Sequence, residues 1–323
     1  MVVGYVNCVL QKLIRQGLFC NFQQRRRAVK LILSNASFQR QRCTSDSTKM
    51  NGDTFEGKLD RFEGITVWSD QESCDIGEFP KKLKNSLTLW RDTKKRGIWF
   101  RVHLEQADWV PVLAKNGFKY HHARDDYVTM YLWLPTTETS NIPHYAHTMI
   151  GVGAVVVNDK DQVLVVQEKF FYKRPMWKLP GGYVEPGENL VDAAIREVME
   201  ETNIRTEFDS LLTLRHVHQG MFGCSDIYIV VSLKPISFDI DKCNREIEKC
   251  QWMDIKEYLK HPHVHELNRF FAHKYLKHRE HSIKIDVHHG IHQLVKIPYT
   301  VYSVEKLDQS DTLEFEWSDT QSK

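Results

Sequence analysis

Residues 1–44 contain no acidic residue at all, although the whole chain of 323 residues carries 44 basic and 42 acidic side chains. The basic residues of this segment are Lys12, Arg15, Arg25, Arg26, Arg27, Lys30, Arg40 and Arg42. Basic, acid-free sequence interleaved with apolar residues is typical of a mitochondrial transit peptide, and a disordered basic tail or a nuclear patch are the alternatives. We expect mitochondrial targeting, and location in the cytoplasm or nucleus for a form that starts at Met50 and lacks the segment.

Long apolar runs and paired cysteines are also missing. No run of about 18 apolar residues occurs, so we expect no transmembrane helix and no membrane partner. The seven cysteines form no C-x-x-C pair, which is typical of free thiols in a reducing compartment. The net charge of +2 does not indicate a nucleic-acid partner, because the positive charge is concentrated at the N-terminus.

Hydrophobic periodicity predicts a small first domain over residues 55–134, after a basic segment and linker over residues 1–54. A helix is expected within 79–97 and another over 106–115, with β-rich runs over 98–104 and 127–134. His121 and His122 invite a metal hypothesis with Asp125 and Asp126. Because adjacent side chains of a strand point apart, a surface turn is the preferred interpretation.

A second domain is predicted over residues 144–262, after a connector rich in proline, threonine and serine. Apolar runs over 151–158 and 163–167 predict an opening hairpin, and 176–182 a strand that enters a glycine turn. Strands over 210–217, 226–233 and 246–252 and a helix over 254–259 follow. Residues 263–323 hold many histidines without cysteine partners or zinc spacing, which favours a polar helical and coil extension.

Three glutamates crowd one patch of the helix expected after the glycine turn. At about 100° per residue, Glu197, Glu200 and Glu201 share a sector, while Val191 and Val198 belong to an apolar one. Like charges at this spacing destabilise an isolated helix, so the pattern is either a solvated face or a site for a cation. Carboxylate oxygens suit hard divalent ions such as Mg²⁺.

The spacing around these glutamates resembles the Nudix box. Gly182 is followed after five residues by Glu188, and after seven more by the run Arg196-Glu197-Val198-Met199-Glu200-Glu201. Asn203 stands where the family normally has glycine; asparagine tolerates the left-handed conformation that ends a helix. The resemblance extends over about residues 55–259 and implies an α/β fold, a Nudix α/β/α sandwich preceded by a small α/β pre-Nudix domain.

The resemblance also implies roles for single residues. Those that match Glu200 and Glu201 bind Mg²⁺ or Mn²⁺, and the one that matches Glu197 binds through water or assists deprotonation. The residue matching Arg196 orients the glutamates, the carbonyl of Gly181 joins the metal shell, and Gly182 and Glu188 form the structural frame. A carboxylate outside the box commonly acts as general base or further metal ligand, and Glu246 is the first candidate, ahead of Glu248.

The implied reaction is attack of water on a pyrophosphate that links a nucleoside diphosphate to another group. ADP-ribose, NADH and NAD-type caps of RNA are the substrates suggested by similar animal and plant members, and a homodimer is a further possibility. Three aromatic residues are candidates for stacking an adenine or for the core: Trp177, Phe222 and Tyr228. The alternative is a catalytically weak nucleotide-binding or protein-interaction regulator that influences cell proliferation.

Overall fold

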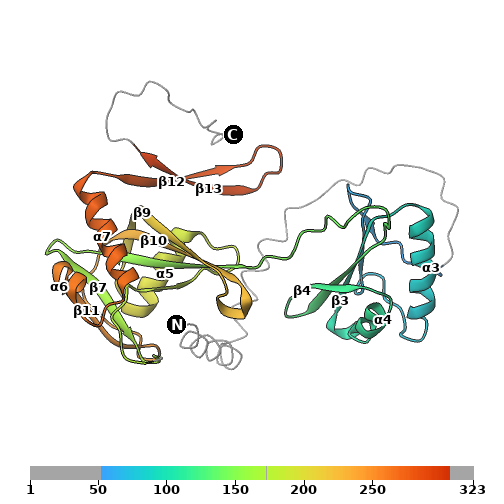
Figure 1. Ribbon diagram of the computed structural model, residues 1–323, viewed down its shortest axis with the longest axis horizontal. Coiled ribbons are helices and arrows are strands. Elements are labelled where there is room, and N and C mark those ends of the chain that lie inside the picture. The colour runs from blue at the N-terminus through green and yellow to red at the C-terminus, as the bar shows by residue number, and fades with distance from the viewer. Residues whose placement is uncertain (1–51, 172, 306–323) are drawn as a thin grey trace, which may run out of the picture. The chain divides into compact units, whose positions relative to one another are not determined.

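The computed structural model describes residues 52–171 and 173–305, so the predicted transit-like segment lies outside the described residues. The chain divides into two compact units, one that ends at Ala146 and one that begins at His147 (Figure 1). None of the helices within the described ranges is long and apolar enough to cross a membrane. Each unit has its own core and is considered separately.

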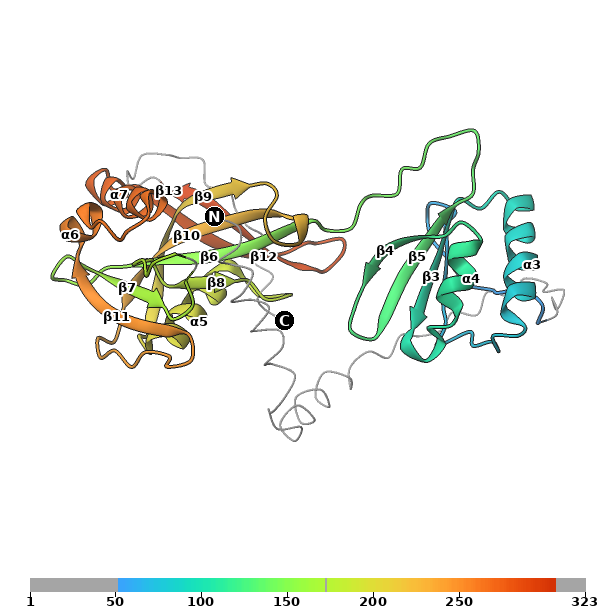
Figure 2. The same ribbon diagram turned by 60° about the horizontal axis from the view of Figure 1, so that its bottom comes forward.

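The first unit is a five-stranded sheet with two helices on one side of it (Figure 2). The strands are β1 (Lys58–Leu59), β2 (Ile65–Trp68), β3 (Gly97–His103), β4 (Lys119–Ala123) and β5 (Tyr127–Trp133), in the order β1-β2-β3-β5-β4. The helices α3 (Phe79–Asp92) and α4 (Trp109–Lys115) place Phe79 and Trp109 in the core, where their rings stack with centroids 4.2 Å apart. The two predicted helices and both predicted strands are therefore confirmed, with α4 starting later than expected.

The surface turn expected at His121 and His122 is wrong, because these residues lie in β4. The pairing of β4 with β5 is irregular between Tyr120 and His122, which marks a bulge. Adjacent side chains of a regular strand point to opposite faces, but here the two Nδ1 atoms lie 2.7 Å apart.

The second unit is built on a four-stranded mixed sheet, in the order β8-β6-β10-β9. Its strands are β6 (Thr148–Val156), β8 (Gly181–Tyr183), β9 (Thr206–Val217) and β10 (Ser225–Pro235), with β10 parallel to β6. Helix α5 (Leu190–Thr202) packs on this sheet through Ala193, Ala194 and Val198. The α/β fold class predicted from the sequence is confirmed.

The hairpin expected at the start of this unit is not formed as predicted. Strand β7 (Gln162–Glu168) follows β6 after a tight turn, but the two meet only at the bridge between Val157 and Val163. Beyond it β7 pairs with β11 (Ile247–Asp254) in a separate two-stranded sheet. Both runs are almost wholly buried and apolar on both faces. Without an alternation of polar and apolar residues, the sequence did not indicate which strand each would pair with.

For the chain after residue 262 a polar helical and coil extension was predicted; a helix is present, but it belongs to the core and a hairpin follows it. Helix α6 (Ile255–Lys260) is followed by α7 (Glu266–Glu280), which buries Phe271 and Ala272 in the same core as Val155 and Trp177. Strands β12 (Lys284–Ile291) and β13 (Pro298–Glu305) then form an antiparallel hairpin where coil was expected. The hairpin is joined to the sheet by a bond from Ile285 N to Ser210 Oγ of 3.0 Å.

Replacement of Phe271 by alanine tests whether α7 belongs to the core of the second unit. Since its side chain is 3% exposed, we expect Phe271→Ala to lower the free energy of unfolding by about 3–5 kcal/mol. Phe270 is 46% exposed and is the matched control, for which we expect a change within about 0.5 kcal/mol. Urea denaturation followed by fluorescence measures both; equal stabilities of the two variants contradict the assignment.

Candidate functional site

Helix α5 positions the carboxylates, and its ends follow from local sequence. Asn189 precedes it in an extended conformation, and its side-chain amide donates to Asp192 in the first turn at 3.0 Å. Asn203 ends it with φ of 63° and donates its backbone N–H to the carbonyl of Met199 at 2.9 Å. This left-handed end confirms the reason for which asparagine was expected to replace glycine.

The turn at Gly181 and Gly182 lies directly against α5. Gly181 N–H donates to Glu201 Oε2 at 3.0 Å, and its φ of +153° is one that other residues rarely adopt. A Cβ on Gly182 would lie 2.4 Å from Glu197 Oε1, so a side chain there would displace this carboxylate. Both glycines are therefore required for the close approach of backbone to carboxylates.

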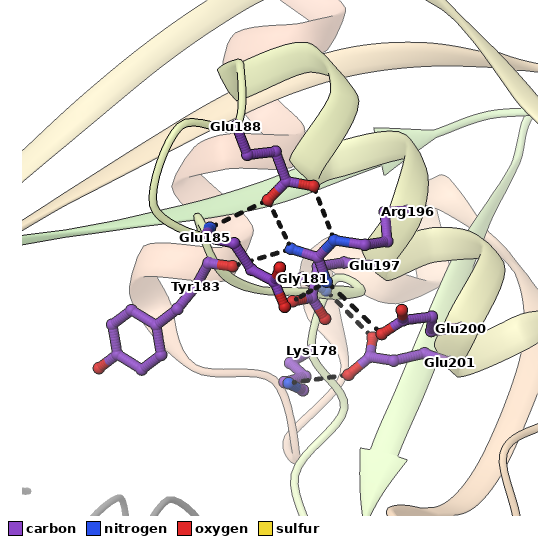
Figure 3. A network of polar contacts seen from close by, with 9 residues as sticks. All are labelled: Lys178, Gly181, Tyr183, Glu185, Glu188, Arg196, Glu197, Glu200 and Glu201. Carbon is purple, nitrogen blue, oxygen red and sulfur yellow. Dashed lines mark hydrogen bonds and ion pairs between the residues drawn. The ribbon is translucent and has the colours of Figure 1, made fainter. Parts of the chain in front are cut away.

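Arg196 holds the acidic residues of the site together (Figure 3). Its guanidinium bonds both oxygens of Glu188, at 2.7 and 2.9 Å, and the carbonyl oxygen of Tyr183 at 3.0 Å. The remaining nitrogen lies 2.9 Å from Glu197 Oε1 and 3.5 Å from Glu200 Oε2. This bidentate pairing lowers the pKa of Glu188 and raises that of Arg196, chiefly through their mutual hydrogen bonds.

The three glutamates of the patch differ in environment. Glu197 and Glu201 are 4% and 5% exposed, whereas the Glu200 side chain is 61% exposed. Burial raises the pKa of Glu201 to about 7, and the negative charge of Glu197 acts in the same direction. Two carboxylates buried so close together favour a cation or a proton between them.

Lys178 and Glu168 complete the site and were not identified from the sequence. Lys178 Nζ lies 2.7 Å from Glu168 Oε1 and 3.6 Å from Glu201 Oε1, and its charge lowers the pKa of Glu201 against the effect of burial. The two residues come together because Lys178 forms a bridge with Val166 of β7. The only signal in the sequence was a charged residue after the apolar run 163–167 and another between the apolar residues Trp177 and Leu179.

Glu246 lies immediately before β11, where its carbonyl accepts a bond of 2.8 Å from Lys169 N–H. The neighbouring Arg245 has a raised pKa because of a hydrogen bond with Cys243 and the charges of Glu246 and Glu200. The backbone of Glu246 is therefore next to that of Glu168, whose side chain contacts Lys178 of the site. Glu248 is exposed on β11.

The three aromatic candidates for adenine stacking differ in how much of the side chain is exposed to solvent. Trp177 is 7% exposed and belongs to the core, and Tyr228 packs against that core with its ring 6.1 Å from that of Phe271. Phe222 is 71% exposed on the loop between β9 and β10, with φ of 55°. Of the three, only Phe222 presents its ring to solvent.

The donor set suits a divalent cation, and basic side chains balance part of its negative charge. Carboxylate and carbonyl oxygens are the ligands that Mg²⁺ and Mn²⁺ prefer. Within residues 52–171 and 173–305, no three histidine, cysteine or acidic side chains converge closely enough to form a metal site as they stand. Arg196 contacts Glu197 and Glu200 while Lys178 faces Glu201, so these basic groups offset part of the negative charge.

Comparison with known proteins finds matches in both units. Residues 55–134 match the family model described as Nudix hydrolase domain, and residues 147–274 match the NUDIX domain model. Nudix hydrolase 5 of Arabidopsis thaliana is 38% identical over 239 residues, which are 71% of this chain and 79% of that protein. Nucleoside diphosphate-linked moiety X motif 6 of Homo sapiens is 40% identical over 212 residues, which are 64% of this chain and 66% of that protein.

The raised pKa of Glu201 predicts a pH dependence of stability for the metal-free protein. Between its ordinary pKa of about 4.5 and about 7, the folded protein holds a proton on Glu201 that the unfolded chain has released. The free energy of unfolding should therefore fall by about 3 kcal/mol as pH rises through this window. Denaturation in chelator over a pH series measures it.

Two variants separate this effect from other titrations. Glu201→Gln should abolish the loss of stability between pH 4.5 and 7, whereas Glu200→Gln, at an exposed position, should keep it. A Glu201→Gln profile parallel to the wild type would show that this carboxyl is not the titrating group.

Proposed function

This chain belongs to the Nudix hydrolase family, and we propose that it is an Mg²⁺- or Mn²⁺-dependent pyrophosphohydrolase of nucleoside diphosphate-linked compounds. The observation that carries the proposal is the network in which Arg196 joins Glu188, Glu197 and Glu200 beside a glycine turn that contacts Glu201. Like charges buried in this way lower the stability of the fold, and a site without catalytic function would not require them.

The proposed roles follow from what each group can do. Glu200, Glu201 and Glu197, with the Gly181 carbonyl, would hold the metal, and Arg196 with Glu188 keeps their oxygens oriented. When bound, the metal neutralises charge on the phosphate oxygens and lowers the pKa of a bound water. Glu246 is the proposed acceptor of the proton released by the attacking water, since it is a carboxylate outside α5 whose backbone lies beside Glu168, which contacts Lys178 of the site.

Substrates of this class include ADP-ribose and NADH. Water adds to one phosphorus, the bridging oxygen leaves with the other phosphate, and two phosphate monoesters result. A name that refers to a nucleoside diphosphate-linked moiety belongs to the human relative and supports this substrate class. Phe222 is the proposed stacking residue for a base, because it is the exposed one of the three aromatic candidates.

Glutamine substitutions of the metal-binding carboxylates test the proposal. Glu200→Gln and Glu201→Gln should each lower kcat roughly 100-fold or more, because each removes a charge needed in the transition state without changing side-chain size. Glu257→Gln is the control, since Glu257 is exposed on α6, and its turnover should be unchanged. Release of AMP from ADP-ribose and from NADH with Mg²⁺ or Mn²⁺ is the measurement.

Two results would contradict the proposal that this chain is a pyrophosphohydrolase. One is the absence of monophosphate release from a panel of nucleoside diphosphate conjugates under conditions in which another Nudix hydrolase works. The other is full activity of both glutamine variants. The first result would leave nucleotide binding without turnover as the interpretation.

Glu246→Gln tests the proposed proton acceptor separately. We expect kcat to fall roughly 100-fold while the metal concentration needed for half-maximal activity stays the same, because a general base acts on the water. If that metal concentration rises instead, Glu246 is a ligand. If neither quantity changes, Glu246 has no role in the reaction.

A further inference from the structure

The sheet of the first unit has one face packed under α3 and α4, and neither of these helices lies on the other face (Figure 2). Ile142 of the connector touches that second face, 3.6 Å from where a Cβ on Gly97 would lie. Strand pairing assigns side chains to the second face: Trp68 lies beside Arg101, Trp99 beside Tyr131, and Gly97 beside Trp133. Tyr127, two residues before Thr129 on β5, belongs to the same face. We call Trp68, Trp99, Arg101, Tyr127, Tyr131 and Trp133 the aromatic face.

The composition of the aromatic face is unusual for an open side of an antiparallel sheet. Solvent-facing strand positions are generally polar, and this side does include Thr66, Thr129 and Lys119. Five large aromatic residues, each partly exposed, nevertheless lie among them. Neighbouring rings contact each other but stay partly exposed. Those of Trp99 and Tyr131 have centroids 5.5 Å apart and planes inclined by 37°. Aromatic rings that lie side by side and stay partly accessible can accept a planar ligand.

The charge on this face has one sign. Arg101 lies among the rings, with its Cζ 4.5 Å from the centroid of Tyr127, and Lys119 occupies the β4 position paired with Tyr131. Paired positions on this side of β2, β3, β4 and β5 contain no acidic residue. At the rim, Asp70 lies 3.4 Å from His103 and Glu138 is paired with Arg96. Arg101 Nε is shielded from water and has no hydrogen-bond partner among the described residues.

The edge of the face shows the kind of contact that it makes. The ring of His122 stacks on that of Tyr145 in the connector, with centroids 4.5 Å apart and planes 10° from parallel. Another part of the connector reaches Trp133, whose Nε1 donates to the carbonyl of Glu138 at 3.2 Å. Flat rings that stack and a positive charge among them match a ligand made of planar bases and phosphates.

We propose that the aromatic face binds single-stranded nucleic acid. Successive bases stack on Trp99, Tyr131 and Tyr127, and phosphates pair with Arg101 and Lys119. Such stacking tolerates different sequences because every base has a flat face. A duplex binds poorly because its bases are already stacked. This site is separate from the proposed hydrolase and does not depend on it.

The test uses the whole chain and a fluorescent single-stranded RNA of about 12 nucleotides with a 5′-hydroxyl end, a length within the range that stacking sites cover. Without a pyrophosphate, this probe offers no bond for the proposed hydrolase. Trp99→Leu should weaken binding about tenfold or more, because base stacking is lost. Arg101→Met should also weaken binding and reduce the salt dependence by about 0.7 in log–log slope, as expected for one phosphate contact on a single strand.

Tyr120→Leu is the matched control. Tyr120 is an exposed aromatic residue of β4, with 65% of its surface accessible. It pairs with Met130, whose side chain lies in the core beneath the helices, so Tyr120 belongs to the opposite side of the sheet from the aromatic face. Its replacement should leave RNA affinity unchanged. Thermal unfolding of all three variants shows whether each is folded, and Arg101→Met carries the test if Trp99→Leu is not.

Two outcomes would overturn the proposal. The first is no binding of the RNA by the wild-type chain, or equal affinities of Trp99→Leu, Arg101→Met and Tyr120→Leu. The second is a dimer, measured by sedimentation, that Trp99→Leu converts to a monomer while RNA binding is absent; the aromatic face would then join two copies of this chain.

Discussion

The site of the second unit depends on the bonds made by the guanidinium of Arg196. It donates hydrogen bonds to both oxygens of Glu188 and to the Tyr183 carbonyl, and so connects the loop before α5 to the middle of that helix. The same group contacts Glu197 and Glu200, so one side chain sets the positions of three carboxylates. A lysine would supply the charge but not the planar fork, and the loop would lose its fixed relation to the helix.

A second constraint comes from burial. Glu197 and Glu201 are almost inaccessible to water, although their charges repel, and α5 buries them beside the apolar residues that attach it to the sheet. Packing of the helix therefore forces the carboxylates into a region of low polarity. Lys178 and the Gly181 N–H partly offset this cost. A buried acidic pair that is incompletely neutralised is suited to take up a cation, which is the physical basis of the proposed metal dependence.

The two units use opposite chemistry. In the second, carboxylates surround a turn whose glycines bring the backbone close, which suits a cation and phosphates. In the first, aromatic rings and Arg101 lie on the sheet face opposite α3 and α4, which suits bases and their phosphates. Both arrangements are positioned by regular structure rather than by long loops: a helix in one unit, and neighbouring strands in the other. Rigid elements of this kind hold side chains at fixed distances.

The sequence by itself determined the features that depend on local geometry. Helical spacing placed Glu197, Glu200 and Glu201 on one patch, asparagine at position 203 predicted the left-handed helix end, and alternation predicted β3 and β5. Only the tertiary structure decided which strands pair, so the expected hairpin of β6 and β7 gave way to the pairing of β7 with β11. That pairing, with the bridge at Val166, brought Glu168 and Lys178 to Glu201, and the fold placed α7 in the core. These contacts join residues far apart in the chain, and no periodicity within a short segment reports on such neighbours.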